Sequence, residues 1–264
     1  MLKNKCSIIS FSGGMDSTSL LLNLLSKKHD IYAISFKYGQ KHGVEVGLAK
    51  KNISYLENNG FKSQINHKVF DISNILSNFN SSLIDKKQDV PEGYYESENM
   101  KSTFVPNRNA IFFSLIYGYA LSLAKNYKQK ISISIGAHSG DHAIYPDCRL
   151  EFFEQLFKSF QIGNWDSDCI ELYIPYINMD KKEILIDAEK SINKLNLDFD
   201  AIFKNTITSY SPDSNGVSSG KTGSDIERIL AFNSLNRKDP IKYQDSWENV
   251  LDNALKTEKE FISE

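Results

Sequence analysis

The feature that most constrains this chain is a glycine-rich corner, SFSGGMDSTSL at residues 10–20. The apolar run before it, at 7–11, is typical of a buried β-strand, and the leucine-rich run at 20–25 is typical of a helix. A strand that turns directly into a helix leaves unpaired backbone N–H groups at the helix N-terminus, where the helix dipole is positive. Because Gly13 and Gly14 carry no Cβ, the backbone can approach an anion closely there. The corner therefore predicts a phosphate or pyrophosphate site.

Hydroxyl residues strengthen this prediction, since Ser12, Ser17 and Thr18 add hydrogen-bond donors around the two glycines. The alternative is an ordinary capped helix start, because serine and aspartate are good N-caps. No Gly-Lys-Ser/Thr sequence follows the glycines, so the corner does not match a Walker-type P-loop.

Strand-like and helix-like segments alternate along the chain. Strands are expected at residues 7–11, 30–36, 64–69, 130–135 and 170–174, and helices at 20–25, 44–56, 109–124, 150–161 and 180–191. This alternation implies right-handed crossovers, and so an α/β fold whose doubly wound parallel sheet is covered by helices on both faces. Residues 75–104 and 205–224 read as irregular.

The composition is ordinary for a soluble globular protein of 264 residues, with 41% hydrophobic and 24% charged residues. A net charge of −2 gives no reason to expect tight nucleic-acid binding, and no apolar run approaches the ~20 residues of a membrane span. The N-terminal apolar stretch is too short for a secretory signal, and the three scattered cysteines indicate no disulfide framework. We therefore expect a cytoplasmic protein.

The order S-G-G-x-D-S-T at residues 12–18 resembles the PP-loop of the N-type ATP pyrophosphatases, which have an adenine nucleotide alpha-hydrolase-like, Rossmann-like fold. These enzymes cleave ATP between its α and β phosphates, and the loop grips the leaving pyrophosphate. The resemblance implies that pyrophosphate and magnesium contact Ser12, Gly13, Gly14, Asp16, Ser17 and Thr18. It implies Asp16 as the magnesium ligand.

Four further blocks follow the corner. They are YGQKH at 38–42 with Glu45, MKSTFVPNRN at 100–109, Gly136 and Asp141 followed by YPDCR at 145–149 with Phe152, and Lys181 with Glu183 and Ile184. Their order and spacing resemble the 7-cyano-7-deazaguanine synthases, the QueC family. The resemblance runs from Ser7 to about Tyr243.

The resemblance also implies roles for single residues. Catalytic roles fall to Asp16, Arg108 and Lys181, and nucleotide binding extends to Gly136 and Lys181. Substrate binding falls to Gln40, His42, Arg108, Asn109, Asp141, Tyr145, Asp147 and Arg149. An arginine suits forked contact with a carboxylate or phosphate, whereas the alternative for Arg108 and Lys181 is an ordinary surface cation near a helix start. His42, His138 and His142 lack the spacing of a zinc-binding helix, so each is expected to make polar contacts.

The implied reaction uses ATP and Mg²⁺ to activate the carboxylate of 7-carboxy-7-deazaguanine. Ammonia then forms the amide, which is activated again and dehydrated to a nitrile. Adenylation makes AMP a good leaving group, so positioning and charge stabilisation do most of the remaining work. The resemblance also implies a homodimer.

The C-terminal part departs from the family. There the synthases carry a cysteine before a tyrosine and then C-G-x-C-x-x-C-x-x-R, four thiolates that bind zinc. The matching residues are TITSY at 206–210 and SGKTGSDIER at 219–228, so hydroxyls and one carboxylate stand where thiolates would hold tetrahedral zinc. We divide the chain into a PP-loop domain at 1–200 and a small irregular C-terminal region at 201–264, whose 205–225 loop must be looser or held by another device.

The lost thiols leave the acceptor open. We slightly favour an antiphage-defence enzyme of the type IV CBASS kind, which joins a deazaguanine to a protein amine. One alternative is a housekeeping synthase that uses ammonia to make the queuosine precursor. Another is a non-catalytic nucleotide-binding partner, but the intact Ser12, Asp16, Ser17 and Arg108 argue against a scaffold.

We predict that the purified protein holds no zinc, because hydroxyls and a carboxylate are poor replacements for a four-thiolate site. Elemental analysis should give far less than one zinc atom per chain. Near-stoichiometric zinc that survives dialysis against a mild chelator would contradict this prediction.

Overall fold

The computed structural model describes residues 4–39, 44–79, 81–84, 92–94, 98–209, 213 and 216–263. Among these residues, five parallel strands form one sheet in the order β3-β2-β1-β4-β5. The strands are β1 (Cys6–Ser10), β2 (Asp30–Lys37), β3 (Ile65–Asp71), β4 (Ile131–Ser134) and β5 (Ile170–Tyr173). All five lie where the sequence predicts them, and the doubly wound parallel sheet is confirmed.

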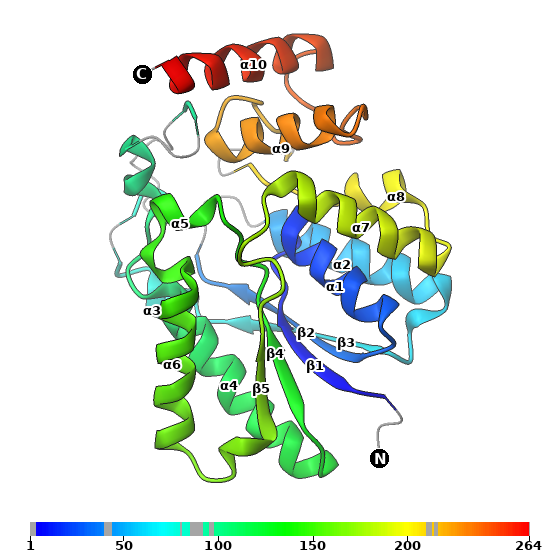
Figure 1. Cartoon of the computed structure of the whole chain (residues 1–264), viewed down its shortest axis with the longest axis vertical. Coiled ribbons are helices and arrows are strands. Elements are labelled where there is room, and N and C mark those ends of the chain that lie inside the picture. Colours follow the sequence, from blue (N-terminus) through cyan, green and yellow to red (C-terminus); the bar gives the residue numbers. More distant parts are fainter. Residues whose placement is uncertain are drawn as a thin grey trace.

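Helices cover both faces of the sheet (Figure 1). One face carries α1 (Met15–Ser26), α2 (Val44–Leu56) and α7 (Lys181–Leu195), and the other carries α4 (Arg108–Tyr127) and α6 (Leu150–Gly163). Shorter helical segments are α3 (Ser73–Leu76), α5 (Asp141–Ile144), α8 (Phe199–Phe203) and the turns Glu57–Phe61, Glu98–Thr103, Pro146–Cys148 and Ser167–Cys169. None of the described helices is long and apolar enough to cross a membrane.

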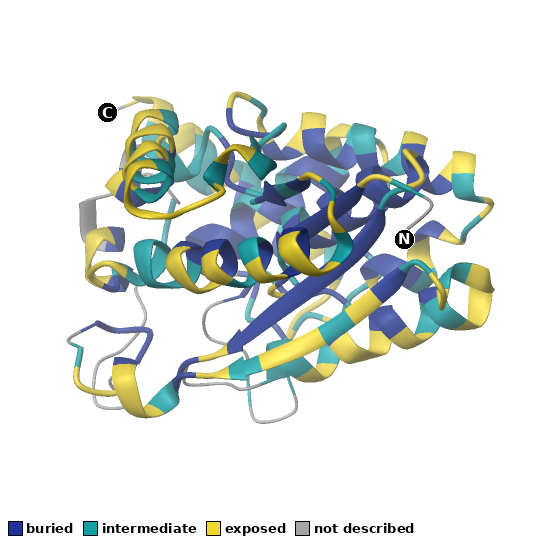
Figure 2. Ribbon diagram, turned by 90° about the horizontal axis from the view of Figure 1, so that it is seen from below, coloured by how far each residue is buried: buried dark blue, intermediate teal, exposed yellow. Residues whose placement is uncertain are grey.

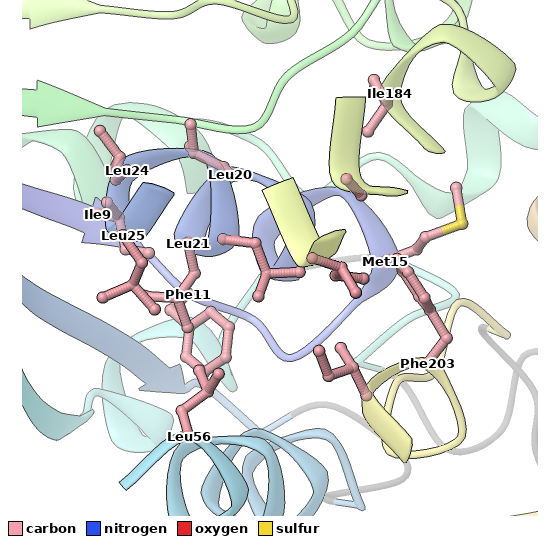
Figure 3. Packing of buried hydrophobic residues seen from close by; sticks show 14 of the residues in the cluster. Ile9, Phe11, Met15, Leu20, Leu21, Leu24, Leu25, Leu56, Ile184 and Phe203 are labelled. Carbon is pink, nitrogen blue, oxygen red and sulfur yellow. The ribbon is translucent and has the colours of Figure 1, made fainter. Parts of the chain in front are cut away.

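The inner strands are buried, as parallel strands between two helical layers must be. Figure 2 shows them in dark blue, whereas the edge strand β3 is mostly teal and yellow. On the α1 face, the leucines of α1 pack with Leu56 of α2 and Ile184 of α7 (Figure 3). Because α1 is buried along almost its whole length, its N-terminus is held firmly at the edge of the sheet.

The strand order reverses between β1 and β4, since the chain runs outward from β1 through β2 to β3 and then returns to the other side of β1. In a doubly wound sheet, a crevice opens at this point beyond the carboxyl ends of the strands. The glycine-rich corner follows β1, and Gly136 follows β4. A Cβ on Gly136 would lie 3.3 Å from the backbone of Asp16, so the two loops meet at the crevice.

The C-terminal part contains two long helices that the sequence pattern does not predict. α9 (Gly223–Ser234) packs on α7, and α10 (Trp247–Ser263) packs on α9 (Figure 1). Among its described residues, the chain between α8 and α9 is irregular, as expected. The many Ser, Thr and Gly residues at 205–224 obscured the start of α9, so only part of the expected irregular region is irregular.

A buried carboxylate, Asp225, stands at the centre of the positions where the resemblance implies zinc-binding cysteines. Asp225 Oδ2 accepts hydrogen bonds from Ser209 Oγ (3.0 Å), Ser219 Oγ (3.4 Å), Thr222 Oγ1 (2.9 Å) and the Gly220 N–H (3.2 Å). Burial raises the pKa of Asp225, and the hydrogen bonds from the hydroxyls oppose this shift. Hydrogen bonds therefore tie together the segments that the thiolates would tie, and this donor set does not fit zinc.

A second buried centre lies one turn further along α9. Arg228 is 0% exposed, and its guanidinium donates to both carboxylate oxygens of Asp239, at 2.6 and 2.9 Å. It also donates to Thr206 Oγ1 (2.7 Å) and to the Phe203 carbonyl (3.2 Å). Forked pairing of this kind holds both partners in a fixed orientation. The Arg228 contacts therefore fasten α9 to the segment that follows α8.

Thr222→Val is expected to destabilise the protein by about 1–3 kcal/mol, because it removes the N-cap of α9 and a hydrogen bond to the buried Asp225. Urea unfolding measures the loss. Thr257→Val on α10 is the matched control, since the Thr257 hydroxyl bonds to the Asn253 carbonyl of its own helix, and it should cost less than about 0.5 kcal/mol. Equal losses for the two variants would contradict the importance of the Asp225 cluster.

Candidate active site

The cavity that gathers most of the predicted site residues, here called the main cavity, lies at the carboxyl ends of β1 and β2 and has a volume of about 220 Å³. Its walls come from the glycine-rich corner, the starts of α4 and α7, the loop after β4, and the C-terminal part through Ile207, Thr208 and Ser224. Residues from both sides of the proposed boundary at 200 therefore line one cavity. The boundary at residue 200 therefore remains a prediction from the sequence, and it does not separate the residues of the cavity.

The glycine-rich corner forms a compact hydroxyl and amide cluster at the N-terminus of α1. Ser12 Oγ accepts a hydrogen bond from the Gly14 N–H (3.2 Å) and lies 3.0 Å from Ser17 Oγ. Gly13 has a φ of +86°, and a Cβ there would lie 2.9 Å from Ala49 Cβ of α2. The left-handed backbone and the close packing of α2 both require glycine at this position.

Lys181, at the start of α7, is buried beside two carboxylates. Its Nζ lies 2.8 Å from Glu227 Oε2 and 3.5 Å from Asp16 Oδ2. Burial alone would lower the pKa of Lys181, but the charges of Asp16, Glu227 and Asp141 outweigh burial and raise it. Lys181 is therefore a fixed cation at the N-terminus of α1, where the phosphates of a nucleotide would also bind.

His138 is 1% exposed and lies between the same carboxylates. Its Nδ1 accepts a hydrogen bond from the Gly140 N–H (3.1 Å), which places the proton of the neutral ring on Nε2. Nε2 is 3.6 Å from Asp141 Oδ1 and 3.9 Å from Asp16 Oδ2, and Nδ1 is 3.9 Å from Glu227 Oε1. His138 makes the polar contacts that the sequence predicts for it, but here they lie in the site.

A side cavity of about 200 Å³ adjoins the main cavity and shares Ser12, Asp16, Arg108 and Asn109 with it. Asp147 supports this shared wall, because its Oδ2 accepts a hydrogen bond from the Asn109 N–H (3.4 Å) at the start of α4. Burial raises the pKa of Asp147, and the positive charge of Arg108 opposes the shift. Arg108 is thus a cation shared by both cavities.

Aromatic rings form another wall of the main cavity. Phe36 and Phe112 stack with their centroids 4.1 Å apart and an interplanar angle of 7°, and Tyr38 lies against Phe112. Burial and the nearby Glu45 raise the pKa of Tyr38 to about 12, although Arg108 opposes the shift. A flat apolar surface beside an anion-binding loop suits a nucleotide base.

The structure brings most of the predicted site residues together. The two cavities are lined by Ser12, Gly14, Asp16, Ser17, Arg108, Asn109, Gly136, Asp141, Tyr145 and Lys181. Four others, Gly13, Thr18, Asp147 and Arg149, do not line either cavity. Arg149 is exposed and donates to the His142 carbonyl (3.2 Å). Gln40 and His42 lie outside the described residues.

Sequence reasoning assigned no site role to Phe36, Tyr38, Glu45, Phe112, His138, Ile207, Thr208, Ser224 or Glu227. The sequence contained a signal for His138, since this residue follows the carboxyl end of β4, two residues after Gly136. Glu227 gave none, because only the packing of α9 on α7 brings it to Lys181.

Asp16 fits the magnesium role that the resemblance implies. Its Oδ1 is buried and accepts no hydrogen bond among the described residues. Mg²⁺ is often held by one or two carboxylates together with substrate phosphates, so a protein cage is not required. Accordingly, no cluster of three or more His, Cys, Asp or Glu ligands is found in the part of the chain that the structure describes.

Residues 6–236 match the family model described as Queuosine biosynthesis protein QueC. The chain belongs to the QueC family. It is 40% identical over 237 residues to the 7-cyano-7-deazaguanine synthase of Pseudoalteromonas translucida, covering 90% of this chain and 98% of that relative. The synthase of Caldicellulosiruptor saccharolyticus is 39% identical over 237 residues, with 90% and 95% covered.

A solved structure of a predicted tRNA methyltransferase subunit from Methanocaldococcus jannaschii is similar at 17% identity and a TM-score of 0.42, covering 70% of this chain and 74% of that one. So weak a likeness adds nothing to the fold described above. The family match confirms the predicted resemblance and the expectation of an ATP-dependent ligase. The names of the relatives fit the housekeeping alternative better than the defence enzyme, for which the comparisons give no support.

Lys181→Met is expected to lower kcat/KM for ATP by about 100-fold or more, because it removes the cation between Asp16 and Glu227. Exchange of labelled pyrophosphate into ATP measures this first half of the reaction. Lys190→Met, at an exposed position of the same helix, is the matched control and should change the rate less than about two-fold. A Lys181→Met protein that folds normally and retains full exchange would exclude Lys181 from the phosphate site.

Proposed function

We propose that this protein is a 7-cyano-7-deazaguanine synthase. It uses two molecules of ATP to convert the carboxylate of 7-carboxy-7-deazaguanine, with ammonia, first to the amide and then to the nitrile. The observation that carries the proposal is the Lys181–Asp16 pair at the glycine-rich corner, which lines the same cavity as Arg108. This arrangement supplies an anion site for the leaving pyrophosphate and a second cation for the reacting carboxylate.

In the first step, a carboxylate oxygen of the substrate attacks the α phosphorus, and the bond to the β phosphate breaks. The N–H groups and hydroxyls of the glycine-rich corner, with Lys181, stabilise the charge on the leaving pyrophosphate. Mg²⁺ at Asp16, when bound, neutralises charge on the phosphate oxygens. Arg108 holds the carboxylate in line, because its fork matches two oxygens at once.

In the second step, ammonia attacks the acyl carbon and AMP leaves. The amide oxygen then attacks the α phosphorus of a second ATP, which releases pyrophosphate, and loss of AMP and of the two amide protons gives the nitrile. The two aromatic rings, Phe36 and Phe112, offer a flat surface for a base. We assign the deazapurine to the side cavity, whose lining includes the polar residues Ser17, Asn109 and Asp141.

The reason to favour a protein amine as acceptor was the loss of the four thiols. The Asp225 cluster accounts for that loss in a different way, since it holds the same segments by hydrogen bonds. A changed acceptor is then not needed to explain the sequence. Ammonia is therefore our proposed acceptor, in a cytoplasmic enzyme, and the homodimer stays a prediction.

The test is incubation of the protein with ATP, Mg²⁺, 7-carboxy-7-deazaguanine and ammonium, followed by mass spectrometry of the products. We expect many turnovers to 7-cyano-7-deazaguanine, with AMP and pyrophosphate released. A parallel reaction replaces ammonium by a peptide with a free N-terminal glycine and should give no conjugate. Formation of ADP, or of the peptide conjugate alone, would contradict the proposal.

A further inference from the structure

A third cavity lies behind the Lys181–Glu227 pair, and we propose that it admits the acceptor amine as an ammonium ion. This rear cavity, of about 400 Å³, is bounded by the start of α7, by α9, by α10 and by the loop at 139–140. Figure 1 shows α9 between α7 and α10, so the cavity lies on the C-terminal side of the site. The inference rests on the proposed function, because it assigns the route of that reaction's second substrate.

The rear cavity adjoins the main cavity. Lys181 lines both of them. Glu227 lines the rear cavity, while its Oε1 lies 3.9 Å from Nδ1 of His138, which lines the main cavity. A small molecule bound at Glu227 is therefore next to the cavity in which the acyl adenylate would form.

The charges of the rear cavity suit a cation. Its walls carry three carboxylates, Asp180, Glu227 and Glu258, and two ammonium groups, Lys181 and Lys182. The Lys181 charge is paired with Glu227 and Asp16, at 2.8 and 3.5 Å, so Asp180 and Glu258 remain to face Lys182. ATP and the deazapurine carboxylate are anions, so their binding is favoured in the main cavity, beside the helix N-terminus. Ammonium is a cation, so its binding is favoured in the rear cavity.

Gly140 gives independent support, because it makes room for the Glu227 carboxylate at the dividing wall. Its φ is −61°, a conformation that any residue adopts, so the backbone does not require glycine here. A Cβ on Gly140 would lie 2.5 Å from Glu227 Oε1 and 2.9 Å from His138 Cε1. Any larger residue at 140 would push the carboxylate away from the histidine and from the wall.

Ammonium has no lone pair, so it must lose a proton before it can attack the adenylate. The Glu227 carboxylate is placed to take that proton at the wall between the two cavities. The neutral ammonia then forms the C–N bond, and the bond from carbon to the AMP oxygen breaks with its electron pair. The attacking nitrogen releases a second proton to solvent, which leaves the neutral amide and AMP.

Glu227→Gln is the test, because it removes the proton acceptor but keeps the shape of the side chain. Pyrophosphate exchange into ATP with 7-carboxy-7-deazaguanine and no ammonium measures adenylation, and amide formation at varied ammonium measures the second step. We expect KM for ammonium to rise about 10-fold or more. Exchange should fall much less than the ammonium-dependent rate, since Asp16 still pairs with Lys181 and the amide oxygen of the new side chain can still accept a hydrogen bond from it.

Gly140→Ala should raise KM for ammonium in the same way, although every titratable group is retained. Glu260→Gln, which removes an exposed charge on α10 outside the cavity, is the matched control and should leave both half-reactions unchanged. Thermal unfolding of each variant verifies that it is folded.

Two results would overturn the inference. Equal losses of exchange and of ammonium-dependent rate in Glu227→Gln would mean that Glu227 acts only through Lys181. An unchanged KM for ammonium in both variants would mean that the amine arrives elsewhere. If the unmodified protein itself shows no exchange, the proposed function fails first, and that outcome is distinct from the other two.

Discussion

The buried ammonium of Lys181 is the interaction on which the rest of the site depends. A charge removed from water costs several kcal/mol unless it is paired, and Lys181 is only 4% exposed. Its partners come from two distant parts of the chain, Asp16 at the start of α1 and Glu227 on α9. Because the closer of the two carboxylates belongs to α9, the packing of α9 on the body of the protein helps to fix the position of the cation.

The position of α9 depends on two buried polar residues near its N-terminus, Asp225 and Arg228. Asp225 gathers hydroxyls and an amide from the segments on either side of the irregular chain, and Arg228 is clamped by Asp239 and Thr206. Glu227 lies between them in sequence. Unpaired buried groups of this kind are costly, so each centre restricts where the helix can lie. Hydrogen bonds thus hold the segments that the resemblance to the family assigns to a zinc site.

The sequence predicted those features that depend on local pattern. All five strands and the glycine-rich corner were readable because parallel strands are continuously apolar and because a strand-to-helix turn of this kind has few physical uses. The start of α9 was not readable. Its N-cap, Thr222, stands among Ser and Gly residues that equally suit a loop, and its stability comes from packing on α7 and α10.

The same distinction holds for the site. Asp16, Arg108 and Lys181 lie next to the ends of elements that the pattern locates, so their convergence follows from the topology of the sheet. Glu227 and His138 approach each other only because Gly140 has no side chain. Gly140 and Glu227 are 87 positions apart in the sequence, so no local pattern reveals this steric condition. Thr18 shows the converse, since its motif position is matched while its side chain is buried away from both cavities.

The charges at the site fit the magnesium ion that we propose for Asp16. Asp16, Glu45 and Asp141 line the main cavity together with Lys181 and Arg108, so carboxylates outnumber the lysine and arginine cations there before any nucleotide binds. An anion as highly charged as ATP is therefore drawn in by oriented N–H groups and the α1 dipole rather than by net charge. The Asp16 oxygen without a hydrogen bond is then the natural place for a divalent cation that enters with the phosphates. The charge of Lys181 is already balanced by Asp16 and Glu227, so we infer that Lys181 does not neutralise the phosphates alone. Its role is then to fix the position at which the phosphates meet the metal ion.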